Sequence, residues 1–222
     1  MKHQTLRAPQ FLAALLLTTT LLAGGPASGL AGNGDSDRLT GSPVTLKVLG
    51  DIYWRSAFGS VVLPADANGN AMVGGVALVP LPDNSASTTA SINVTLKAGQ
   101  PFFLPLLALF GTSYSDGTPS DPVLTESMFK KHLKQLKLQV DGRTVLGEKD
   151  ALDFLTQFNF EPPIPYDAAP INAIIYEQGI SVIHNGLAHG PHVIKLDVKF
   201  SAAPPVFAAF EFHNTFNVTV VP

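Results

Sequence analysis

Apolar and polar residues alternate most regularly in the last quarter of the chain. From residue 192 to residue 200 the even positions are mainly apolar and the odd positions mainly polar, and the alternation returns between Phe210 and Val220. A period of two residues puts successive side chains on opposite faces of a strand. We therefore predict two long antiparallel strands here, each with one face in the core and one in solvent.

Shorter segments earlier in the chain follow related patterns. "VTLKV" (residues 44–48) and "SINVTLK" (residues 91–97) alternate cleanly, while residues 60–64 and 74–82 are short apolar runs next to turn-forming residues. Runs of this length with β-branched residues and flanking Gly, Pro or Asn are typical of strands. We predict a strand in each of the four segments, with order beginning near Val44.

The segment "FFLPLLALF" (residues 102–110) stops alternating and is almost wholly apolar. A strand with two apolar faces is one that is covered on both sides. Pro105 argues against a single regular central strand, because proline has no N–H to donate to a neighbour. We predict a short strand to Leu104 followed by an irregular segment. The run is too short to span a membrane.

A helix is predicted near residues 123–136, where Phe129, Leu133 and Leu136 share one helical face. Alternation then leads into Asp141–Gly142, a residue pair that favours a two-residue hairpin turn.

Two further segments lie between the hairpin and the C-terminal strands. The proline-rich residues 161–170 are predicted as a loop, and residues 171–183 as two short β-rich stretches. The sum of short strands, frequent turns and one helix predicts an all-β fold. We expect an antiparallel β-sandwich, Ig-like or jelly-roll-like, formed by residues 44–222 as a single domain with one short α-helix near 123–136.

Residues 1–29 have the features of a secretory signal peptide. Lys2 and Arg7 precede an apolar core at 11–23, and small residues follow it. The alternative is a membrane anchor, but the core is shorter than the roughly 18–20 residues that a spanning helix needs. We expect cleavage, a flexible lead-in over residues 30–43, and a secreted or periplasmic protein without a membrane span.

Composition narrows the classes of partner. The chain has no cysteine, so an exported protein of this sequence must rest on its hydrophobic core rather than on disulfides. The net charge is −3, and loss of Lys2 and Arg7 with the signal peptide would make it more negative. A mildly acidic chain without a basic stripe is a poor candidate for binding nucleic acid.

Three histidines form the one cluster of metal-ligand residue types. His184, His189 and His192 occur within nine residues and could hold zinc or copper if a loop brought them together. Their spacing matches no standard metal motif, and His192 falls on the apolar face of its predicted strand, where a histidine usually packs in the core. A secreted metal-dependent hydrolase using these residues is therefore an alternative hypothesis, and no cofactor is the first expectation.

Tyr53 and Trp54 are the candidate ligand-binding pair. Sugar-binding β-sandwiches use exposed Trp and Tyr rings as platforms, which makes a carbohydrate-binding module a further alternative. Most other aromatic residues are Phe, which has no polar group and is typical of a core. A packing role for the pair is the competing interpretation.

Several motifs together resemble an uncharacterised family of exported bacterial β-rich proteins. They are "YW" (53–54), "LPADANG" (63–69), "VTLKAGQPFFLPLL" (94–107), "LKLQVDGRTV" (136–145), "LAHGPHVIKLDVKF" (187–200) and "FNVTV" (216–220). The family has a "PAGkplffPi"-like core motif, a "vDG" hairpin and a C-terminal "PGxHxI" strand. This chain departs from it with Lys97 in place of the first Pro and with no cysteine. The resemblance implies an exported β-rich fold and no particular activity.

No set of residues in the sequence matches a standard catalytic motif. There is no cysteine nucleophile, no G-x-S-x-G turn and no glycine-rich phosphate loop. We therefore expect an exported, non-enzymatic binding or envelope-associated protein. Its partner would be an unknown protein, an envelope component or a small ligand.

Overall fold

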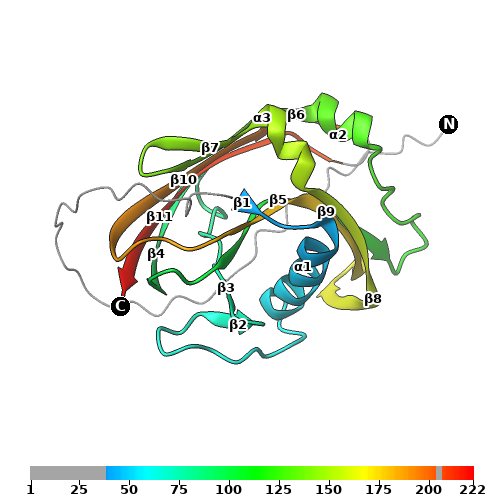
Figure 1. Cartoon of the computed structure of the whole chain (residues 1–222). Helices are drawn as coiled ribbons and strands as arrows, with labels where there is room; N and C mark the ends of the chain where they lie inside the picture. The colour runs from blue at the N-terminus through cyan, green and yellow to red at the C-terminus, as the bar shows by residue number, and fades with distance from the viewer. Residues whose placement is uncertain (1–38, 204–206) are drawn as a thin grey trace.

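The computed structural model describes residues 39–203 and 207–222, which form a mostly β protein with two mixed sheets and three α-helices (Figure 1). The prediction of a β-rich fold is confirmed, and its Ig-like or jelly-roll-like type stays a prediction. The predicted signal peptide lies outside the described residues. The predicted lead-in, residues 30–43, ends in ordered elements, because a two-residue strand and the start of a helix fall within it.

Sheet A has six strands. Its order is β1-β9-β5-β3-β2, and β8 also pairs with β9. The strands are β1 Leu39–Thr40, β2 Ala71–Val73, β3 Val76–Leu78, β5 Phe102–Tyr114, β8 Leu155–Ala168 and β9 Ile171–His184. All pairs are antiparallel except β3 with β5.

Sheet B has five strands in the order β4-β11-β10-β6-β7. They are β4 Thr89–Lys97, β6 Leu133–Val140, β7 Arg143–Gly147, β10 Gly190–Phe200 and β11 Phe210–Val221. The pairs are antiparallel except β4 with β11. The predicted alternation is confirmed, since Ile194, Leu196 and Val198 are buried while Lys195 and Lys199 are exposed.

The predicted hairpin turn joins β6 to β7. Asp141 and Gly142 both have positive φ angles, 49° and 79°. Two left-handed residues in succession match the right-handed twist of the flanking strands, and Asn, Asp and Gly adopt that conformation most readily. The sequence therefore sets this turn locally.

The first helix, α1 Pro43–Ala57, corrects the prediction of a strand at 44–48. The Ser42 side chain accepts a hydrogen bond from the Thr45 N–H, and Pro43 occupies the first turn. Both are features of a helix start. The buried residues Leu46, Leu49 and Tyr53 recur with helical spacing, so they bury one face of a helix that the shorter alternation concealed.

The predicted helix near 123–136 exists but is shorter. The second helix, α2 Glu126–His132, is capped by Thr125 and ends where β6 begins at Leu133. The third, α3 Glu148–Ala151, continues as a 3₁₀ turn at Leu152–Phe154.

Strand β5 corrects the prediction that regular structure stops at Leu104. It is one strand of 13 residues, and its register with β9 shifts between Pro105 and Leu107. The neighbour on its other side, β3, pairs only with Phe102 and Phe103. Pro105 therefore lies at a bulge beyond the end of β3, where the missing N–H breaks no regular ladder.

Strands β8 and β9 correct the predicted proline-rich loop and the two short stretches after it. They form one long hairpin, and among the described strands β8 pairs with β9 alone. Prolines are tolerated on such an edge, and the register shifts between Asn159 and Ile164, around Pro162 and Pro163.

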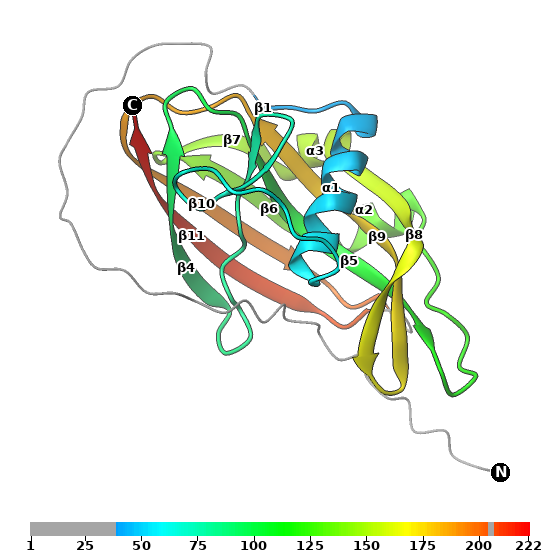
Figure 2. The ribbon, with the colours of Figure 1, turned by 90° about the horizontal axis from the view of Figure 1, so that it is seen from below.

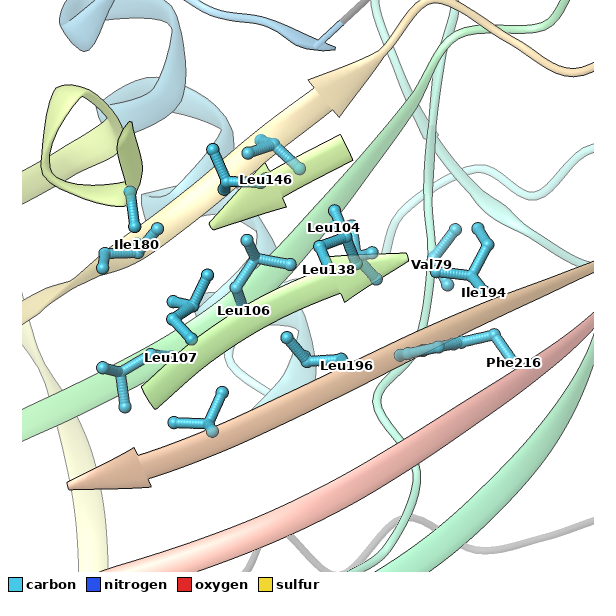
Figure 3. Packing of buried hydrophobic residues seen from close by; sticks show 14 of the residues in the cluster. Val79, Leu104, Leu106, Leu107, Leu138, Leu146, Ile180, Ile194, Leu196 and Phe216 are labelled. Atoms are coloured by element: carbon cyan, nitrogen blue, oxygen red, sulfur yellow. The ribbon is translucent and has the colours of Figure 1, made fainter. Parts of the chain in front are cut away.

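Two clusters of buried side chains hold the fold together. The first lies between the sheets and includes Leu104 from β5, Leu138 from β6 and Phe216 from β11 (Figure 3). The second lies between α1 and the outer face of sheet A and includes Trp54 and Phe103. Sheet A is thus covered on both faces, whereas β10 in sheet B alternates between buried and exposed residues.

Candidate functional site

The structure buries the aromatic pair proposed as a platform. Tyr53 is 6% and Trp54 is 3% exposed, on the face of α1 that packs on sheet A. The Trp54 ring lies edge-on to the rings of Tyr53 and Phe110, with centroids 4.8 Å from each. Neither ring offers a free face in this structure, which favours the competing interpretation of a packing role for the pair.

His184 is a core residue at the end of β9. It is 1% exposed, and its ring stacks on Phe102 with centroids 4.9 Å apart. Its Nδ1 accepts a hydrogen bond of 3.2 Å from the Gly186 N–H. Burial lowers the pKa of His184 to about 4, so the ring stays neutral at physiological pH.

His192 uses both ring nitrogens within the protein. Its Nδ1 lies 2.7 Å from Asp141 Oδ2 and its Nε2 lies 2.9 Å from the Ala188 carbonyl oxygen. These contacts tie the β6–β7 turn to β10 and occupy both ring nitrogens within the protein.

The third histidine, His189, is exposed on the loop before β10. Within residues 39–203 and 207–222, no group of three or more His, Cys, Asp or Glu side chains is placed to hold a metal ion. The three histidines that the sequence singled out therefore do not converge.

Strands β8, β9 and the end of β5 project beyond the other strands at one end of the molecule (Figure 2). Residues of this end line a shallow hollow. Its volume is about 420 Å³. It is lined by Ser115, Pro165, Tyr166, Asp167, Ala169, Ile171 and Asn172. No sequence motif marks these residues, which come together only because β5 and β8 both pair with β9.

Hydrogen bonds hold the rim of the hollow. The N–H and hydroxyl of Ser115 donate to the Pro170 carbonyl oxygen at 2.9 and 3.1 Å. The Ser113 hydroxyl donates to Asn172 Oδ1 at 2.5 Å. The Tyr166 ring lies edge-on to Phe58 with centroids 6.4 Å apart. The hollow is therefore built on paired strands and not on a long free loop.

The loop after β5 is fastened by one carboxylate. Asp121 Oδ2 accepts from the N–H and hydroxyl of Thr112 at 3.0 and 2.7 Å, and Oδ1 accepts from the Tyr114 hydroxyl at 3.0 Å. Tyr176 adds a hydrogen bond of 2.7 Å to the Pro122 carbonyl oxygen. Asp121 is thus occupied by structural bonds.

The strands that build the hollow carry no positive side chain. Residues 98–129 and 150–194, which include β5, β8 and β9, contain neither Lys nor Arg. Arg55 on α1, which reaches β8, bonds Asp51 at 3.0 Å and the Pro162 carbonyl oxygen at 2.9 Å. The lining of the hollow therefore contains one acidic side chain, Asp167, and no basic one.

Glu177 is a buried acid that the sequence reasoning overlooked. It is 2% exposed, and its Oε1 has no hydrogen-bond partner among the residues that the structure describes. The neighbouring Gln178 is also buried, but its amide bonds both the N–H and the carbonyl of Leu124. An acid inside the apolar run "IIYEQGISVI" was the available signal.

Among the described residues, no helix is both long and apolar enough to span a membrane.

Comparison with known proteins names no relative. No protein-family model and no curated protein sequence matches the chain. A structure of PbICP-C in complex with falcipain-2 is similar at 14% identity and a TM-score of 0.25, covering 67% of this chain and 100% of the other. The solution structure of amebosin is similar at 14% identity and a TM-score of 0.18, covering 60% and 96%. Similarities at such TM-scores carry no argument about function.

Proposed function

We propose that this protein is an exported, non-enzymatic binding protein that recognises a positively charged segment of a partner protein with the hollow at its projecting end. The observation that carries the proposal is this open hollow on paired strands, with an aromatic ring and an acid in its lining. Export is supported by the sequence pattern of residues 1–29.

The lining suits a peptide. Tyr166 is half-buried against Phe58 and combines an apolar ring with a hydroxyl group, the combination that is enriched at protein interfaces. Asn172 and Ser115 add polar groups beside it. An open hollow of this kind gives a chain segment access from solvent, whereas small-molecule sites usually enclose most of their ligand.

The charge of the strands that build the hollow favours a partner segment of positive charge. With no Lys or Arg in residues 98–129 and 150–194, an anionic segment meets repulsion and a cationic one attraction. Attraction at an exposed site is screened by salt over a Debye length of about 8 Å at physiological ionic strength. Binding should therefore weaken as salt is raised.

The binding test uses labelled lysine-rich and glutamate-rich peptides of equal length, with anisotropy as the readout. We expect the lysine-rich peptide alone to bind, and Tyr166→Ala or Asp167→Asn to weaken it about three- to tenfold, which corresponds to about 0.7–1.4 kcal/mol. Glu148→Gln removes the same charge on α3, away from the hollow, and should leave affinity unchanged. Failure of the lysine-rich peptide to bind, or an equal loss in Glu148→Gln, contradicts the proposal.

Export has a separate test. Expression of the full chain followed by fractionation and N-terminal mass spectrometry should recover a protein that begins after residue 29 or close to it, outside the cytoplasm. A full-length cytoplasmic protein refutes the export part and leaves the binding part standing.

A further inference from the structure

Glu177 lies directly beneath α1. Its partners on the neighbouring strands are Phe110 in β5 and Phe158 in β8, and cross-strand partners share a face of the sheet. Both phenylalanines pack in the cluster under α1. A Cβ atom on Gly50 would lie 3.1 Å from the Phe158 ring, which shows how closely the helix approaches. The carboxyl group is therefore enclosed by a helix above and aromatic rings on either side.

A row of small residues next to Glu177 makes room for its carboxyl group. Thr156, Gly179 and Ala108 are partners across three strands and share the face beneath α1. A Cβ atom on Gly179 would lie 2.2 Å from Glu177 Oε1 and 2.2 Å from the Leu107 carbonyl oxygen. The two oxygens are therefore no more than twice that distance apart. Both are acceptors unless the carboxyl group carries a proton, which makes it a donor.

Among the described residues that face Glu177 from α1, β5 and β8, none offers a free positive charge to a carboxylate at this position. On α1, Asp51 and Arg55 pair with each other at 3.0 Å, and the phenol of Tyr53 is neutral because burial raises its pKa. The facing positions of β5 and β8 are Ala108, Phe110, Thr156 and Phe158, none of which titrates. Burial accordingly raises the pKa of Glu177 well above its ordinary value.

The buried layer between α1 and sheet A contains a second unpaired polar group. Trp54 Nε1 is buried without a hydrogen-bond partner in the described part of the chain, and its ring packs against Phe110, the cross-strand partner of Glu177. An unpaired donor and an unpaired acceptor in one dry layer make the contact between α1 and sheet A costly to hold. This contact is the weak point of the second core.

We propose that Glu177 is a proton-operated lock on α1: the neutral carboxylic acid keeps the helix seated on sheet A, and loss of the proton releases the helix so that water reaches the carboxylate. Release exposes Trp54 and leaves the core between the two sheets in place, because that core is built on the other face of sheet A.

The direction of the pH effect follows from the linkage between protonation of Glu177 and stability of the folded state. A group whose folded-state pKa is raised gives its full stability below the unfolded value, here 4.5, and loses it as pH rises toward the folded pKa. Seating of α1 is therefore strongest in acid and weakens as pH rises. This is the reverse of the behaviour of a carboxylate in a salt bridge.

The chain's single tryptophan reports on this contact. In wild-type protein between pH 5 and pH 9, we expect Trp54 emission to shift to longer wavelength and quenching by neutral acrylamide to increase severalfold, while far-UV circular dichroism keeps its β signal. Glu177→Gln removes the titrating proton and should hold Trp54 shielded across the range. Asp51→Asn, a charge loss on the same helix, should leave the transition at the same pH.

Hydrogen exchange of wild-type protein gives a second readout that needs no variant. After correction for the intrinsic pH dependence, amides of α1 should lose protection as pH rises, whereas those of β10 and β11 keep theirs. A Trp54 that stays shielded from pH 5 to pH 9, a transition that survives in Glu177→Gln, or equal loss of protection in α1 and β10 overturns the proposal.

Discussion

The two sheets differ in what lies over their outer faces. Sheet A has α1 there, and the strand β5 is buried along most of its length on both sides. In sheet B, β10 alternates between buried and exposed residues, so its outward-facing side chains meet solvent. The comparison shows that the number of covered faces, and not strand pairing itself, sets the hydrophobic pattern of a strand.

The outer faces also differ in the surroundings of their charged residues. On sheet B, His213 lies 2.7 Å from Asp197, and Lys199 lies 2.8 Å from Glu211, all within reach of water. On sheet A, Glu177 is dry and has no hydrogen bond from any described residue to Oε1. Because water screens the exposed pairs on sheet B, they contribute little to the free energy of unfolding. Because water is excluded from Glu177, its unpaired carboxyl group destabilises the folded state.

The largest expected effect tests whether the outer face of sheet A is a true core. Phe103→Ala removes a fully buried ring that packs on Tyr53 with centroids 5.7 Å apart, and should lower the free energy of unfolding by about 3–5 kcal/mol. Thr215→Ala, on the outer face of sheet B, should change it by no more than about 0.5 kcal/mol. Denaturant unfolding measures both. Similar losses in the two variants would erase the contrast.

A substitution of intermediate expected effect tests how closely Gly179 approaches the Glu177 carboxyl group. Gly179→Ala places a methyl group against Glu177 Oε1 and the Leu107 backbone, so we expect a loss of about 1–3 kcal/mol in unfolding free energy. Gly147→Ala is the matched control, because a Cβ atom there meets nothing within 4 Å. Thermal or denaturant unfolding that ranks the two variants equally would contradict the packing described here.

The smallest effect concerns the exposed pair on sheet B. The hydrogen bond to Asp197 raises the pKa of His213 above 6.5. The stability that the His213–Asp197 pair adds is therefore fully present below pH 6.5 and is lost as pH rises through the pKa of His213 in the folded protein. His213→Gln should cost no more than about 0.5 kcal/mol at pH 5.5 and nothing at pH 9, since the pair is exposed. A difference that grows with pH in denaturant unfolding would show the opposite linkage.

The sequence predicted sheet B well because its strands have one wet face. Alternation located β4, β10 and β11, and Asp141–Gly142 located the β6–β7 turn. Sheet A and its helix were harder. Residues 44–48 alternate over too short a span to exclude a helix. The helical spacing of apolar residues becomes clear only when the segment that is read extends to Tyr53.

For the candidate sites too, the sequence showed the residue types, and only the fold showed their surroundings. Trp54 was weighed as platform or core, and only the placement of α1 decides for the core. The hollow joins residue 115 to residues 165–172 through the pairing of β5 with β9, which is long-range information that no local pattern holds. Glu177 was visible as an acid in an apolar run, but its lack of a partner is a property of three-dimensional packing.

The parallel pairing of β4 with β11 has a consequence for how the chain reaches its final state. These strands lie side by side although their residues are far apart in sequence, 124 positions in the case of Asn93 and Asn217. Closing so long a loop has an entropic cost that must be met before the contacts form, which slows folding. A polypeptide emerging from the ribosome cannot complete sheet B until β11 has been synthesised and is free to pair with β4.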